Sequence, residues 1–169
     1  MKKEPYIKMT QPFRGNAKAG RAIHIINKIL TYSVFIAYPI LLLYLLFLRN
    51  PILGRAIIVP LDSFIIVSVF RHIVNRKRPY EYFEVKPVID KDTEGKSFPS
   101  RHVFSAFVIS MTFIFCSPMT WQWIVISTVL FLISTGIAII RVLSGVHFIS
   151  DVIAGAIVGI AAGLIGFLL

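Results

Sequence analysis

A histidine and an aspartate lie where two long apolar stretches of the sequence meet. His147 and Asp151 are four residues apart, so on a helix they share one face, and the carboxylate can hold one imidazole nitrogen. The other ring nitrogen is then free to act as a nucleophile or a base. Arg141 ends the preceding apolar stretch. Each side chain alone has a structural explanation: Arg141 could reach the lipid headgroups, His147 could lie in the membrane interface and Asp151 could cap a helix. The three together favour a functional site.

Two further polar clusters adjoin apolar stretches in the same way. One contains Arg71 and Arg78, and the other contains Ser100, Arg101 and His102. The planar guanidinium of arginine suits phosphate oxygens, and Ser100 can cap the following helix so that its N–H groups face the same anion. The sequence has no acidic cluster suited to magnesium or a metal pair. We therefore predict phosphoryl transfer that uses no metal and no cofactor.

The two histidines can divide the chemistry between them. We expect His147, oriented by Asp151, to attack phosphorus and form a phosphohistidine. His102 would donate a proton to the leaving oxygen and later help to activate the hydrolytic water. Charge on the equatorial oxygens would be stabilised by three arginines, Arg71, Arg78 and Arg141.

The composition places these clusters in a membrane protein. Of the 169 residues, 56% are hydrophobic, and a soluble domain of this size would have too little polar surface to cover itself. The formal charge is +10, but the basic residues gather at segment ends and in one loop. Nucleic-acid binding needs a basic surface of another kind, so we expect a membrane and a phosphorylated lipid as partners and no nucleic acid.

Five apolar stretches predict the fold. They cover residues 29–48, 52–74, 100–116, 121–140 and 148–169, and they predict an all-α, polytopic membrane helix bundle with about five transmembrane helices. Residues 1–27 are interpreted as a flexible basic tail that ends in a short amino-terminal interfacial helix, and residues 28–169 as the transmembrane domain. The last stretch has Gly155, Gly159 and Gly163 at every fourth position, which favours close packing inside the bundle over a dimer seam. The oligomeric state stays open.

Alternation of the crossings predicts that all three polar clusters meet at one membrane face. The connection of residues 75–98 adjoins the same face and contains mixed charges and aromatic residues. Long loops in compact domains are usually functional or disordered. We interpret this connection as a lid or rim over the site.

In order and spacing, the clusters resemble the three signature motifs of the type 2 phosphatidic acid phosphatase superfamily, the lipid phosphate phosphatases related to bacterial acid phosphatases and vanadium haloperoxidases. The first motif is a lysine, six residues and Arg-Pro, and this chain has Arg71, six residues and Arg78-Pro79. The second is Pro-Ser-Gly-His, here Pro99-Ser100-Arg101-His102. The third is Ser-Arg, five residues, His, three residues and Asp, here Ile140-Arg141, His147 and Asp151 at the same spacing.

The resemblance implies a metal-independent membrane phosphatase that hydrolyses a lipid phosphomonoester or diphosphate, such as phosphatidate, phosphatidylglycerophosphate or a polyprenyl diphosphate. Three positions depart from the family pattern: Arg71 replaces lysine, Arg101 replaces glycine and Ile140 replaces serine. Arg101 would either crowd the phosphate or bind a second one. The alternative is a catalytically weak family member that binds or translocates phosphorylated lipid.

Two arguments about orientation in the cell membrane conflict. The resemblance implies a multi-pass protein whose site faces outside the cytoplasm. An odd number of spans, however, puts the basic tail on the same face as the site, and the excess of positive charge would then hold both in the cytoplasm.

Overall fold

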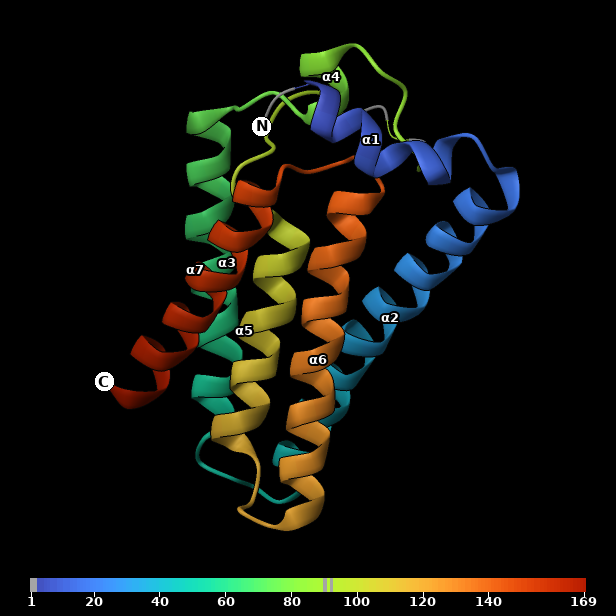
Figure 1. The fold of residues 1–169 in the computed structure, drawn as a ribbon. Coiled ribbons are helices and arrows are strands. Elements are labelled where there is room, and N and C mark those ends of the chain that lie inside the picture. Colours follow the sequence, from blue (N-terminus) through green and yellow to red (C-terminus); the bar gives the residue numbers. More distant parts are fainter. Residues whose placement is uncertain (1–2, 90, 92) are drawn as a thin grey trace.

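The computed structural model describes residues 3–89, 91 and 93–169, and all the regular elements in this part of the chain are helices (Figure 1). They are α1 (Lys3–Arg14), α2 (Ala17–Phe47), α3 (Leu53–Val74), α4 (Pro79–Phe83), α5 (Arg101–Cys116), α6 (Trp121–Leu143) and α7 (Ile149–Leu168). Of these described helices, α2, α3, α6 and α7 are long and apolar enough to cross a membrane. The predicted all-α bundle is confirmed, and four helices rather than five reach spanning length.

The third predicted span, α5, is short and is the central helix of the bundle. It has 16 residues, which corresponds to about 24 Å against a hydrocarbon core of about 30 Å. Most of its side chains are buried, and it packs against α2, α3, α6 and α7. The surrounding helices carry the large exposed apolar side chains. The start of α5 is therefore held in the middle of one end of the bundle.

The glycine stripe of α7 faces α5. A Cβ added at Gly155 would lie 2.7 Å from the carbonyl oxygen of Ser100, and one at Gly159 would lie 2.7 Å from that of Phe104. Neither backbone can move without shifting the helix that carries it. The stripe thus serves packing inside the bundle, as predicted, and it fixes the start of α7 against the start of α5.

This contact predicts a loss of stability on substitution. Gly159→Ala should destabilise the protein by about 1–3 kcal/mol, because the new methyl group overpacks against α5. The matched control is Gly54→Ala in α3, where an added Cβ meets nothing within 4 Å and alanine is the better helix former. Thermal unfolding in detergent, followed by circular dichroism, compares the two. Equal melting temperatures for the two variants would contradict the packing role.

The amino-terminal segment is helical, so the predicted flexible tail is wrong. Helix α1 lies across the end of the bundle (Figure 1), and Tyr6 is buried against Phe83, with ring centroids 4.9 Å apart. The Tyr6 hydroxyl also donates a hydrogen bond to the carbonyl of Gly145 at 3.0 Å. The sequence did not predict this contact, because the basic composition of the segment gives no sign that Tyr6 is buried. The predicted interfacial helix is not separate, because α2 runs without interruption through residue 27.

Candidate active site

The ends of four segments meet at the α1 end of the bundle (Figure 1): the end of α3, the connection after it, the start of α5 and the turn between α6 and α7. They enclose a cavity of about 370 Å³. Its described lining residues are Ser68, Arg71, His72, Arg78, Lys91, Thr93, Lys96, Arg101, His102 and His147. The structure therefore brings five of the eight predicted site residues to one cavity, and both predicted catalytic histidines are among them.

His147, in the wall of this cavity, lies against Asp151. Their closest atoms, Nδ1 of His147 and Oδ2 of Asp151, are 3.5 Å apart, and both side chains are almost completely buried. The spacing suggested that the two residues share a helix face. They do not, because α7 begins at Ile149, between them. Asp151 instead reaches back over the first turn of α7 and accepts a hydrogen bond from the N–H of Phe148 at 2.9 Å. With Nδ1 turned toward the carboxylate, Nε2 is the nitrogen left for chemistry.

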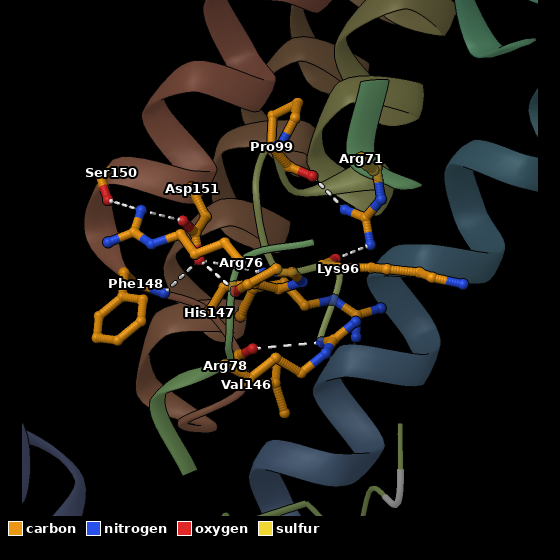
Figure 2. Close-up of polar contacts among 12 residues, drawn as sticks. Arg71, Arg76, Arg78, Lys96, Pro99, Val146, His147, Phe148, Ser150 and Asp151 are labelled. Atoms are coloured by element: carbon orange, nitrogen blue, oxygen red, sulfur yellow. Dashed lines mark hydrogen bonds and ion pairs between the residues drawn. The ribbon is translucent and has the colours of Figure 1, made fainter. Parts of the chain in front are cut away.

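Two further residues hold Asp151, and the sequence did not single out either of them. Arg76 donates from Nη1 to Oδ1 of Asp151 at 2.8 Å (Figure 2), and its guanidinium lies 4.6 Å from the ring centroid of Phe148. The Ser97 hydroxyl donates to Oδ2 and lies 3.4 Å from Nδ1 of His147. Arg76 belongs to a run of basic residues, and Ser97 to a polar loop. No spacing rule distinguished either one from its neighbours.

Arg71 and Arg78 are anchored by backbone carbonyls. Arg71 donates to the carbonyls of Pro99 and Lys96 (Figure 2). Arg78 donates from Nε to Gly95 at 3.0 Å. Burial lowers the pKa of Arg78, but a guanidinium stays protonated in proteins. These bonds fix both cations at the cavity wall without neutralising their charge.

The second motif contributes differently from the prediction. Ser100 occupies the N-cap position of α5, but its hydroxyl makes no capping bond, so the capping prediction is wrong. The hydroxyl is buried and has no partner among the described residues, while the Ser100 N–H donates to the carbonyl of Asp151 at 2.8 Å. Arg101 lies at the cavity, with its guanidinium 5.4 Å from the ring centroid of Phe64. His102 lines the cavity one residue further along α5.

Arg141 is not among the described residues that line the cavity. Its side chain is buried, and its Nε has no partner within the described part of the chain. Its carbonyl accepts a bond from the N–H of His147 at 3.3 Å. The backbone of Arg141 therefore positions His147, and a phosphate contact from its side chain stays a prediction.

The connection after α3 covers the cavity and supplies cations that lie outside the three motifs. Lys91, Thr93 and Lys96 line the cavity from this connection, whereas Asp90 and Asp92 lie outside the described residues. Burial, together with the positive charges of Arg141 and Arg78, lowers the pKa of Lys91 to about 8. None of the described lining residues is acidic. The cavity is thus suited to an anion with more than one negative charge.

Residues 51–169 match the PAP2 superfamily. The chain belongs to this superfamily. The three polar clusters lie inside the matched region, as the resemblance of the motifs indicated. Together with the apolar helices, membership makes this PAP2 chain a multi-pass membrane protein.

Two curated relatives are similar to this PAP2 chain over part of their length. The bacitracin transport permease protein BcrC of Bacillus licheniformis is 30% identical over 62% of this chain and 51% of its own length. An undecaprenyl-diphosphatase of Sulfolobus acidocaldarius is 28% identical over 74% of this chain and 59% of its own length. The chain therefore spans only a little more than half the length of these relatives.

Two solved structures share the fold. LpxE of Aquifex aeolicus superposes with a TM-score of 0.70 at 24% identity, over 91% of this chain and 95% of that protein. A PAP2-type phosphatidylglycerolphosphate phosphatase of Bacillus subtilis superposes with a TM-score of 0.73 at 18% identity, over 96% and 83% of the two chains. At these identities the likeness establishes the fold of the PAP2 chain.

The environment of His147 predicts an unusual titration. Burial lowers the pKa of His147 to about 4, although its contact with Asp151 acts in the opposite direction. The ring should stay neutral as the pH falls below 6.5, the ordinary histidine pKa, and become protonated only near pH 4. Because the unfolded chain binds the proton first, His147 should reduce the stability of the folded protein progressively as the pH falls across this window.

Histidine ¹⁵N resonances of the unliganded protein in detergent measure this titration, and His147→Ala assigns the signal. A His147 resonance that titrates near pH 6.5 would show that the ring is not buried as described.

Proposed function

We propose that this chain hydrolyses the phosphate or diphosphate group of a membrane lipid through a phosphohistidine on His147. The observation that carries the proposal is that His147, supported by Asp151, and His102 line one cavity rich in cations. The name of the Sulfolobus relative, an undecaprenyl-diphosphatase, supports the same class of reaction. The cavity lies at the end of a membrane bundle, where the phosphate of a lipid would lie with its chains still in the hydrocarbon.

The reaction has two steps. In the first, Nε2 of His147 attacks phosphorus, the bond from phosphorus to the leaving oxygen breaks, and His102 donates a proton to that oxygen. The negative charge of the bound phosphate favours the protonated form of His102 that this step needs. In the second, His102 takes a proton from water, the water oxygen attacks phosphorus, and the N–P bond breaks to release phosphate and neutral His147.

The arginines act on the charge that develops in both steps. Arg71 and Arg78, held by their carbonyl partners, would bind the equatorial oxygens. Arg141 and Ser100 are buried beside them with unpartnered polar atoms among the described residues. We propose that these groups make their bonds when phosphate is present.

A lipid diphosphate suits the cavity better than a phosphomonoester. Arg101, Lys91 and Lys96 add three cations to those needed for one phosphoryl group. The name of the Sulfolobus relative also refers to a diphosphate. Phosphate release should be measured on purified protein in detergent with phosphatidate, phosphatidylglycerophosphate and a polyprenyl diphosphate. We expect the highest kcat/KM for the diphosphate, and a preference for phosphatidate would contradict this substrate assignment.

The competing function is binding or translocation of phosphorylated lipid without cleavage, which the departures at Arg71 and Arg101 would favour. The same assay separates the two functions when it is run in EDTA, with and without vanadate. Phosphate release that persists in EDTA and is blocked by vanadate supports hydrolysis without a metal. Lipid binding with no release of phosphate would overturn it.

We further propose that the site faces outside the cytoplasm, as membership of the superfamily suggests, against the distribution of positive charge. Helix α1 and the cavity lie at the same end of the bundle, so the amino terminus and the site should lie on the same side of the membrane. Tags at the amino terminus and beside Lys91 should both be accessible from outside intact cells. Tags that react only after permeabilisation would place the site in the cytoplasm.

A further inference from the structure

A second, larger cleft lies at the same end of the molecule and shares none of its described lining residues with the cavity of His147 and His102. It has a volume of about 590 Å³ and lies between the end of α1, the start of α2 and residues 86–89. Four residues of α2 line it, Ala17, Gly20, Arg21 and His24. Their spacing places them on a single helix face. Gly20 lets the segments approach closely, because an added Cβ would lie 3.1 Å from the carbonyl oxygen of Phe13.

The chemistry of the cleft suits an amphiphilic anion. Arg14, Arg21 and Lys86 line it together with His24, and none of the described lining residues is acidic. The Nε atom of Arg14 is buried and has no partner in the described part of the chain. The remaining wall is largely apolar, formed by Phe13, Ala17, Pro87, Val88 and Ile89.

The position of the cleft along α2 indicates where its ligand comes from. His24, at the cleft, is followed by the exposed apolar side chains of Ile25, Ile26 and Ile29. At 1.5 Å per residue, His24 lies about 7.5 Å from Ile29 along the axis of α2, so the cleft adjoins the apolar part of this helix. With this apolar part of α2 in the hydrocarbon, the cleft would lie at the level of the lipid headgroups, within reach of a lipid that stays in the bilayer.

Arg14 also connects the cleft to the turn before His147. Its Nη2 donates to the Tyr6 hydroxyl at 3.0 Å, and that hydroxyl donates to the carbonyl of Gly145 at 3.0 Å. The N–H of Val88, in the cleft wall, donates to the carbonyl of Ser144 at 3.0 Å. Two of the three segments that form the cleft, the end of α1 and residues 86–89, are therefore linked by hydrogen bonds to the turn between α6 and α7.

We propose that this cleft binds the phosphate headgroup of an anionic membrane phospholipid and that the bound lipid holds α1 and residues 86–89 against the turn before His147. The anion would pair with Arg21 and with the free Nε of Arg14, while the acyl chains follow the apolar residues of α2. This inference concerns binding and does not depend on the proposed hydrolysis.

The test uses the full-length protein in detergent with dilauroyl phosphatidylglycerol, and native mass spectrometry counts the retained lipid. Arg21→Gln and Arg14→Gln should each weaken retention on the order of tenfold, because each removes one charge-assisted contact. The matched control is Lys18→Gln, which removes the same charge from an exposed position of α2 outside the cleft. Dilauroyl phosphatidylcholine tests the need for an anionic headgroup, and soluble glycerol phosphate tests the need for chains.

Retention of phosphatidylglycerol that is lost in both cleft variants and kept in Lys18→Gln supports the site. Equal loss in Lys18→Gln would overturn it, as would equal retention of phosphatidylcholine or equally strong binding of glycerol phosphate. The effect on α1 has its own measurement. Amide hydrogen exchange in residues 3–14 should slow when phosphatidylglycerol is added to the wild-type protein and should not change in Arg21→Gln. Unchanged exchange in the wild-type protein would contradict the proposal that the bound lipid holds α1 in place.

Discussion

Replacing His147 with alanine is expected to lower kcat for lipid phosphate hydrolysis by at least about 10³-fold, because the variant lacks the nitrogen that we propose as the nucleophile. Wild-type protein quenched during turnover of a ³²P-labelled substrate should carry an acid-labile, base-stable phosphate, and the variant should carry none. Melting temperature in detergent, measured in parallel, shows that the variant is folded.

His72→Ala is the matched control. His72 lines the same cavity from the end of α3, but its side chain is exposed and has no step assigned to it. We expect this variant to keep its activity within a few-fold of wild type. If His72→Ala lost activity as completely as His147→Ala, or if labelled phosphate stayed on the protein without His147, the nucleophile would be misassigned.

The second large effect is expected for Asp151→Asn. The substitution keeps the size of the side chain but removes the charge that faces Nδ1 of His147 and Nη1 of Arg76. An amide can also present its NH₂ group to the ring and so hold the wrong tautomer. We expect kcat to fall by about 10²–10³-fold with a smaller change in KM, because the effect is on the orientation and tautomer of the nucleophile.

Arg76→Gln separates two roles of Asp151: its salt bridge with Arg76 and its orientation of the His147 ring. It removes the salt bridge to Asp151 and leaves the carboxylate facing His147. The Arg76 side chain is 38% exposed, so solvent screens its charge and we expect a loss of about tenfold or less. A loss as large as that of Asp151→Asn would mean that Arg76, and not the carboxylate, carries the effect.

The sequence predicted the bundle well because a membrane imposes a simple rule. Each spanning helix needs a long apolar stretch, and the starts and ends of α3, α5, α6 and α7 fall within a few residues of the predicted stretches. The glycine stripe was also readable, since close packing of two helices needs small residues at regular spacing. The amino-terminal helix was not, because one buried tyrosine in a basic segment leaves no periodic pattern.

For the site, the sequence by itself determined which motif residues to consider and which end of the bundle they occupy, since both follow from residue type, spacing and the count of crossings. Only the tertiary structure decided how they are held. Arg76 and Ser97 reach Asp151 from a loop more than fifty residues away in the chain, and Lys91 and Lys96 complete the cavity from the same loop. Such contacts depend on how a polar loop folds back over helix ends, and no local periodicity encodes that path.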